Sequence, residues 1–509
     1  MARAVAGVRE AVVSPASRNV VLVGNFGAVN LGDEILLSTV ARWVAEHGDT
    51  AIAVSTVPEH TRAAHGIETA FYADPAALVE AIADADLVVL AGGGLFQDYD
   101  ELDPDALERF PAFGVTQFAQ YVYLAEALGV PCIALAQGVG PLRSEGARSI
   151  VADVFSRLDA CSVRDPDSAA LLFRIGVPRV PMVAPDPAWA WTPRSTPSFA
   201  MPAELAGRKV LAVNVRDWAF APGWEDALAA ALAPALSSEW GCLWLDFAVP
   251  PPGASVERDA AAHRVVDAMA RLGNASAHAY WSGTTADEAL AALAACDAAV
   301  AMRMHAALLA LRARLVTVTL EYDAKVATLA DDTAVADWQR VPIAEIATRL
   351  PPALSRAMGG DASVVRMTNE ALEHQRLAAL AHRELLHSAL ARLPPRELQA
   401  HGGKIAWFST WFPQDDSPQR IVRALAQKAG RMRDRDAAAR AAIEHGATQL
   451  REANAERDAE AHARAASQAA HAQSTAHLDA ILRSRSYRAT APLRRLSQWR
   501  ARLASRTKK

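Results

Sequence analysis

Basic side chains stand at the ends of several predicted strands. Arg164, Arg216, Arg303 and Lys325 each follow a short apolar run that is typical of a buried strand. Guanidinium groups bind carboxylates and phosphates through paired hydrogen bonds. Because the carboxyl ends of parallel strands meet at one edge of a sheet, these four cations predict a binding site for an anionic substrate.

A histidine accompanies one of these arginines. His305 lies two residues after Arg303 in AMRMHAALLAL (301–311), a run that is otherwise almost entirely apolar. An imidazole at the mouth of a cleft can transfer a proton near neutral pH. A core histidine beside a structural ion pair of Arg303 is equally consistent with the pattern, because arginine is seldom buried without a partner.

A glycine-containing loop connects the first predicted strand to a helix in LVGNFGAVNLGDEILL (22–37). Its spacing differs from the dinucleotide-binding and P-loop patterns. Asn25, Asn30, Gly32 and Asp33 are the polar and small residues that we expect to line a ligand site there. Asp33 could accept a proton from a hydroxyl group, or it could only cap the helix.

Two further glycine loops follow predicted strands, AGGGLFQD (91–98) and AQGVGPL (136–142). Glycine lets the backbone approach a ligand closely, and amide and carboxylate side chains can bind hydroxyl groups. Tight strand-to-helix turns would produce the same sequences. The candidate ligand-binding residues in these loops are Gly93, Gly94, Gln97, Asp98, Gln137 and Gly138.

Two successive series of short apolar runs and helical stretches organise most of the chain. The first series occupies residues 20–195 and the second residues 208–350, with a Pro- and Ser-rich linker between them. Such alternation is typical of mostly parallel sheets with helices on both faces. The sequence therefore predicts an α/β protein whose two domains face a cleft, where ligands commonly bind.

The remaining segments differ in composition from these two domains. Residues 1–19 are predicted to be a flexible leader, and 360–395 a closing helix. We expect a connector over 400–418, then a long Ala-rich helix over 420–480 that either stands alone or forms a weak coiled coil and so a homo-oligomer. Residues 481–509 form a basic tail with ten Lys or Arg and no Asp or Glu.

Charge and composition limit the possible partners. The whole chain has a net charge of −5, whereas residues 420–509 contain 20 Lys or Arg and 8 Asp or Glu. A basic tail with interleaved aromatic residues predicts either contact with an anionic membrane surface or a solvated tail. No apolar run is long enough for a transmembrane helix. The four scattered cysteines indicate neither zinc nor disulfides, and we expect a cytoplasmic protein that binds no nucleic acid.

Seven motifs, in this order, resemble those of the polysaccharide pyruvyl transferases over residues 20–350. They are GNFGAVNLGDE, AGGGLFQD, AQGVGPL, RDPDS, PDPA (185–188), MRMHA and YDAKV. The resemblance implies two Rossmann-like domains, similar to B-type glycosyltransferases. It also implies phosphoenolpyruvate as co-substrate, no cofactor, and a sugar diol of a cell-surface polysaccharide or its lipid-linked precursor as acceptor, which receives a pyruvate ketal.

The resemblance also assigns roles to particular residues. His305 and Arg164 match functional positions of the family, so His305 is the expected acid and Arg164 an expected donor-binding residue. From their own positions in the sequence, Arg303, Arg216 and Lys325 are further candidates for donor binding, and Asp33 is a candidate base. No metal site is expected, because no His, Asp or Glu cluster has ligand spacing. SRSYRATAPLRRL (484–496) resembles a segment that ends many bacterial polysaccharide glycosyltransferases.

Two other functions are consistent with the same sequence. A glycosyltransferase of this architecture would use a nucleotide sugar, although no clear nucleotide-gripping Glu or basic pair is present in the second domain. A non-catalytic scaffold in polysaccharide assembly would act through its helical tail. The polar residues present in every motif favour an enzyme.

Overall fold

The computed structural model describes the chain over residues 17–27, 30–99, 114–236, 239–248, 260–333, 335–359 and 362–393, with the backbone alone for 362–369. Most of the predicted leader lies outside these residues. The predicted connector, Ala-rich helix and basic tail also lie outside them, so their roles stay predictions. None of the helices in the described part of the chain has the length and apolar character needed to cross a bilayer.

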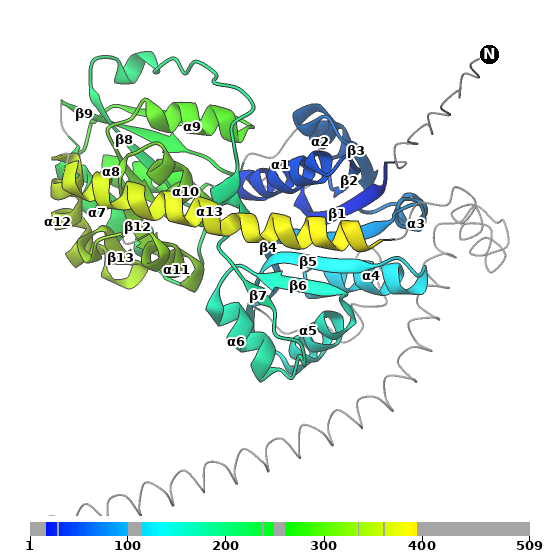
Figure 1. The fold of residues 1–509 in the computed structure, drawn as a ribbon. Helices are drawn as coiled ribbons and strands as arrows, with labels where there is room; N and C mark the ends of the chain where they lie inside the picture. Colours follow the sequence, from blue (N-terminus) through cyan, green and yellow to red (C-terminus); the bar gives the residue numbers. More distant parts are fainter. Residues whose placement is uncertain are drawn as a thin grey trace, which may run out of the picture. The chain divides into compact units, whose positions relative to one another are not determined.

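In the described residues, seven parallel strands form a first sheet in the order β3-β2-β1-β4-β5-β6-β7. The central strands are apolar along most of their length because helices cover both faces of the sheet (Figure 1). The strands are β1 (Asn19–Phe26), β2 (Thr50–Ser55), β3 (Glu68–Phe71), β4 (Leu87–Asp98), β5 (Cys132–Leu142), β6 (Ala160–Val163) and β7 (Met182–Val183). The helices are α1 (Leu31–Glu46), α2 (Pro58–His65), α3 (Pro75–Ala83), α4 (Val115–Ala127), α5 (Glu145–Arg157), α6 (Pro166–Arg174) and the 3-10 turn η2 (Pro187–Ala190).

Six parallel strands form a second sheet in the order β10-β9-β8-β11-β12-β13. Its strands are β8 (Lys209–Asn214), β9 (Trp240–Leu245), β10 (His278–Trp281), β11 (Ala298–Ala301), β12 (Val316–Glu321) and β13 (Arg340–Pro342). The helices and turns are η3 (Ala203–Leu205), α7 (Trp224–Ala235), α8 (Ala261–Arg271), α9 (Ala286–Ala294), α10 (Met304–Arg312), α11 (Ala324–Asp332), η4 (Asp337–Gln339), η5 (Ile343–Glu345), α12 (Ile346–Met358) and α13 (Ala362–Arg392).

The predicted α/β fold with two Rossmann-like halves is confirmed. In each sheet the strand that comes first in the chain lies in the interior, and the strand order reverses beside it. That arrangement creates a crevice at the carboxyl ends of the strands. The sequence did not reveal β3 and β13, because both are short and neither is a continuous apolar run.

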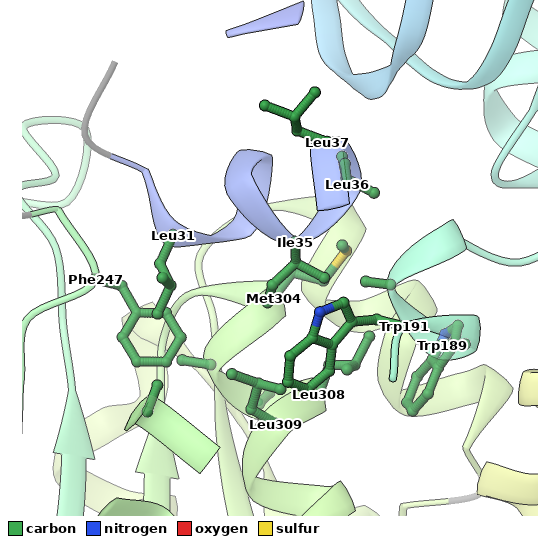
Figure 2. Packing of buried hydrophobic residues seen from close by; sticks show 14 of the residues in the cluster. Leu31, Ile35, Leu36, Leu37, Trp189, Trp191, Phe247, Met304, Leu308 and Leu309 are labelled. Atoms are coloured by element: carbon green, nitrogen blue, oxygen red, sulfur yellow. The ribbon is translucent and has the colours of Figure 1, made fainter. Parts of the chain in front are cut away.

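One apolar core connects the two halves. Figure 2 shows Leu31 and Ile35 of α1 on one side, with Phe247 and Met304 of the second half beside them. The same cluster continues to Trp191, which follows η2. Burying large side chains of this kind is worth about 1.5–3 kcal/mol each, so the shared core stabilises the arrangement of the two sheets.

The closing helix α13 contacts both halves. It packs against η2, α1, β5 and β6 of the first half and against α10 of the second, and Figure 1 shows it in yellow running along both. Ala379, Leu386 and Leu390 are its fully buried apolar residues. The helix predicted for 360–395 therefore exists and completes the core between the sheets.

Candidate active site

Both crevices open into one cleft. Asn25 is near the carboxyl end of β1, and Gly93 and Gln97 are in the carboxyl-terminal part of β4, so these residues lie where the first sheet reverses its order. Arg216 follows β8 and Arg303 follows β11, at the corresponding reversal of the second sheet. The topology alone therefore brings residues from distant parts of the chain to one place.

The cleft has a volume of about 150 Å³, which suits a small ligand. Four cations, one carboxylate and one imidazole are among its side chains. Its lining residues are Asn25, Asn30, Asp33, Gly93, Gly94, Gln97, Arg164, Arg216, Phe247, Arg303, Met304, His305, Tyr322 and Lys325. Eleven of the fifteen residues proposed from the sequence are in this list.

The other four lie beside the cleft. Asp98 is buried and accepts a hydrogen bond from the backbone N–H of Ser144 at 2.7 Å, which fixes the start of α5. Gln137 is also buried, and its amide nitrogen donates to the carbonyl oxygens of Leu90 and Leu135 at 3.0 and 3.1 Å. Gln137 therefore links β5 to β4, whereas Asp98 anchors the N-terminus of α5. Gly32 and Gly138 have a steric role instead.

The two glycines leave room for functional side chains. A Cβ atom on Gly32 would lie 2.0 Å from Nδ1 of His305. A Cβ on Gly138 would lie 2.4 Å from the Nη2 atom of Arg164. Since such distances are far shorter than any van der Waals contact, each glycine is required for its neighbour to occupy the observed position.

Arg164 and His305 share a buried carboxylate that the sequence analysis left out of the site. Asp186 Oδ2 lies 3.3 Å from Nη1 of Arg164, and its Oδ1 lies 3.6 Å from Nε2 of His305. Oδ1 also accepts a hydrogen bond from the N–H of Ala188 at 3.0 Å. Burial by itself would raise the pKa of Asp186, but the charges of His305 and Arg164 and the backbone N–H of Ala188 hold this pKa below its ordinary value.

Asp186 is therefore an ionised group behind the imidazole. It lies in the PDPA motif (185–188), from which the sequence alone predicts no role for the carboxylate. The signal that could have revealed it is an acid that follows the short strand β7, at the same edge of the sheet as the buried Arg164.

Asn30, and not Asp33, is the N-cap residue of α1. The side-chain oxygen of Asn30 accepts from the N–H of Gly32 at 3.3 Å. Asn30 also donates to Asp33 Oδ2 at 2.9 Å. Asp33 lies in the first turn of α1 and lines the cleft. The helix cap is therefore provided by Asn30, and the Asp33 carboxylate faces the ligand site.

The environment of Asp33 suits a base. Burial raises the pKa of Asp33 to about 6, although His305, the Asn30 hydrogen bond and Arg164 act in the opposite direction. A carboxyl with this pKa is mostly ionised at neutral pH and can still accept a proton effectively.

The cations differ in how strongly they are already bound. Lys325 Nζ lies 3.6 Å from Asp323 Oδ2, and Arg164 lies against Asp186. Arg216 donates to the Tyr322 hydroxyl at 3.2 Å, and among the residues that the structure describes it has no carboxylate partner. Arg216 can therefore bind an anionic ligand without breaking an ion pair.

A buried histidine of α13 supports this arrangement from behind. His382 Nδ1 is 2.9 Å from Ser162 Oγ, and its Nε2 is 3.0 Å from the carbonyl oxygens of Ala184 and Pro185. These two carbonyls immediately precede Asp186 in the chain. The closing helix thus fixes the segment that carries the buried carboxylate.

The motifs of this cleft are matched by one family model. The model for "Polysaccharide pyruvyl transferase" covers residues 30–324, more than half of the chain. The chain belongs to the polysaccharide pyruvyl transferase family. The family match includes Asp33, Arg164, Asp186 and His305, and it ends before α13.

Comparison with solved structures shows similarity of the fold. The described fold is similar to a glycosyltransferase from Rickettsia africae ESF-5, with 11% identity, 74% of this chain and 100% of that chain covered, and a TM-score of 0.49. It is also similar to a UDP-GlcNAc 2-epimerase from Neisseria meningitidis bound to UDP-GlcNAc, with 9% identity, 74% and 100% coverage, and a TM-score of 0.47. A sequence search of the curated proteins gives no match.

Proposed function

We propose that the protein transfers the enolpyruvyl group of phosphoenolpyruvate to two hydroxyl groups of a sugar and so forms a pyruvate ketal. The observation that carries this proposal is the pairing of four cations with His305 and Asp33 in one small cleft. Phosphoenolpyruvate bears a carboxylate and a phosphate, and both are ligands that guanidinium and ammonium groups bind.

The donor would lie among the basic side chains. Arg216 and Arg303 come from the second half and Arg164 from the first. A ligand with two anionic groups can therefore contact both halves at once. Because Arg216 has no carboxylate partner in the described part of the chain, its charge is available to the phosphate or the carboxylate of the donor.

The first chemical step is protonation of the donor. The Asp186 carboxylate, 3.6 Å from Nε2 of His305, stabilises an imidazolium. His305 then gives its proton to the methylene carbon of phosphoenolpyruvate, and the neighbouring carbon becomes oxocarbenium-like. General acid catalysis of this kind contributes about 100- to 10,000-fold.

Two hydroxyl groups of the acceptor complete the ketal. Asp33 takes the proton of the first hydroxyl as its oxygen bonds to the cationic carbon. The second hydroxyl attacks the same carbon, the bond to the phosphate oxygen breaks, and its proton leaves with inorganic phosphate. The proton that Asp33 accepted then passes to His305, which restores the acid and the ionised base, and the second proton neutralises the leaving group, so the enzyme returns to its starting state. The acceptor would be a polysaccharide or its lipid-linked precursor.

The proposal is tested by phosphate release from phosphoenolpyruvate across a panel of glycans and lipid-linked sugars, without any nucleotide sugar. Mass spectrometry of the product should show a pyruvate ketal. His305→Ala should remove turnover while circular dichroism stays unchanged. His263→Ala is the matched control, because His263 stacks on Tyr280 and does not line the cleft.

Donor binding is measured separately by isothermal titration. Arg164→Ala and Arg303→Ala should weaken phosphoenolpyruvate binding much more than acceptor binding. Turnover that requires a nucleotide sugar would instead favour the glycosyltransferase. Near wild-type turnover of His305→Ala would contradict its assignment as the acid.

A further inference from the structure

An aromatic surface lies beside the cleft and takes no part in the chemistry proposed above. It consists of Tyr99, Trp218, Phe220 and Tyr322, which we call the aromatic platform. The Trp218 ring lies 4.7 Å from the Tyr322 ring and 5.0 Å from the Phe220 ring, and Tyr99 stacks on Phe220 at 5.9 Å. Tyr322 lines the cleft, so the platform begins at the site.

The platform extends outward into solvent. Phe220 is 56% exposed, whereas Trp218 and Tyr322 are half-buried. Large aromatic side chains that are left exposed next to a ligand cleft are typical of a binding surface. None of the sequence motifs of the site contains Trp218 or Phe220, and the chemistry of the donor requires neither.

Cations and polar groups border the aromatic rings. The Arg216 guanidinium lies 5.6 Å from the Trp218 ring and 5.4 Å from the Tyr322 ring, and Arg143 lies 5.6 Å from the Phe220 ring. The platform thus has flat apolar faces with hydrogen-bond donors at their edges. A sugar ring has the complementary pattern, because its C–H groups form apolar faces and its hydroxyl groups surround them.

We infer that the aromatic platform binds the sugar units of the acceptor glycan adjacent to the unit that receives the pyruvate. The inference rests on the proposed function for the identity of the cleft's acceptor. It adds a second subsite, which makes an oligosaccharide a better ligand than a single sugar. The diol would lie near Asp33 and the rest of the glycan on Trp218 and Phe220.

A purely structural role for the rings makes a different prediction. The Tyr99 hydroxyl donates to Asp323 Oδ2 at 2.9 Å, so Tyr99 joins the first half to the second. If the platform only held the two halves together, its disruption would weaken donor binding, because residues of both halves line the cleft. Trp218 and Phe220 are therefore the residues to change, and Tyr99 is left intact.

The experiment uses the full-length protein and a glycan array of mono- and oligosaccharides, without phosphoenolpyruvate. Wild type, Trp218→Ala, Phe220→Ala and the control Phe173→Ala are compared, Phe173 being a 75% exposed phenylalanine on α6. Loss of one aromatic contact should weaken binding of oligosaccharides about tenfold. Binding of monosaccharides should be unchanged in both variants. In a separate titration, phosphoenolpyruvate binding should be unchanged in Phe220→Ala, which serves for this comparison because Trp218 lies against the donor-binding Arg216.

Three outcomes overturn the inference. Absence of oligosaccharide binding by wild type does so, as does an equal loss in Phe173→Ala. Weaker phosphoenolpyruvate binding in Phe220→Ala indicates the structural role instead. If wild type binds oligosaccharides through Trp218 but releases no phosphate from phosphoenolpyruvate, the proposed reaction fails while the subsite stands.

Discussion

Replacing Asp33 by asparagine should stabilise the protein and abolish its activity. Burial raises the pKa of this carboxyl from 3.8 to about 6. The folded protein therefore retains the proton at pH values where the unfolded chain has lost it. The free energy of unfolding therefore decreases as the pH rises from about 4 to about 6. Above that range, the contribution of ionised Asp33 to this free energy stays constant.

The size of the effect follows from the shift in pKa. Each pKa unit corresponds to about 1.36 kcal/mol, so the ionised carboxylate lowers the free energy of unfolding by about 3 kcal/mol at pH 7.5. At pH 5, where the folded protein is mostly protonated at this position, the cost is about half as large. Asparagine has nearly the same shape as the protonated acid and carries no charge.

The measurement is thermal unfolding of wild type and Asp33→Asn at pH 5 and pH 7.5, together with phosphate release. The variant should unfold at a higher temperature, with the larger gain at pH 7.5, and should have no turnover. Glu34→Gln is the control, because Glu34 accepts hydrogen bonds from His65 at 2.6 Å and from the N–H of Gly27 at 2.7 Å, and so should be destabilising to replace.

Two results would refute this reasoning. An unfolding temperature of Asp33→Asn that is equal to or below that of wild type at both pH values would show that ionised Asp33 carries no burial cost. Wild-type turnover in the variant would show that Asp33 is not the base.

Three further predictions concern the neighbours of the site. Gly32→Ala should reduce turnover about 100-fold with unchanged circular dichroism, because its methyl group would displace His305; near wild-type turnover would contradict the proposed position of the imidazole. His382→Ala should lower the free energy of unfolding by about 3 kcal/mol, because it leaves buried carbonyl groups without a donor; denaturant titration that shows no change would count against this support of Asp186. Chelation should leave turnover unchanged, because the described residues contain no cluster of three ligands for a metal ion; recovery of lost activity by Mg²⁺ would overturn this expectation.

The sequence alone determined the architecture and the position of the cations. Strands that are buried on both faces must be apolar, so β1, β4, β5, β8, β11 and β12 appear as short runs, and their ends can be found from local composition. Since parallel strands point the same way, residues such as Arg216 and Arg303 had to meet at one edge of the second sheet. Short strands such as β13 carry too few apolar residues to be recognised in this way.

Only the tertiary structure decided which polar residues act together. Asp186, Arg164 and His305 come from three distant segments, and no local pattern encodes distances of 3.3 and 3.6 Å between them. The same holds for Gly32, whose missing side chain makes room for a residue of the other half. Local composition reports whether a side chain is buried or exposed. The pairing of charges depends on packing between segments that are far apart in the chain, and so it becomes visible only when both halves and α13 are in place.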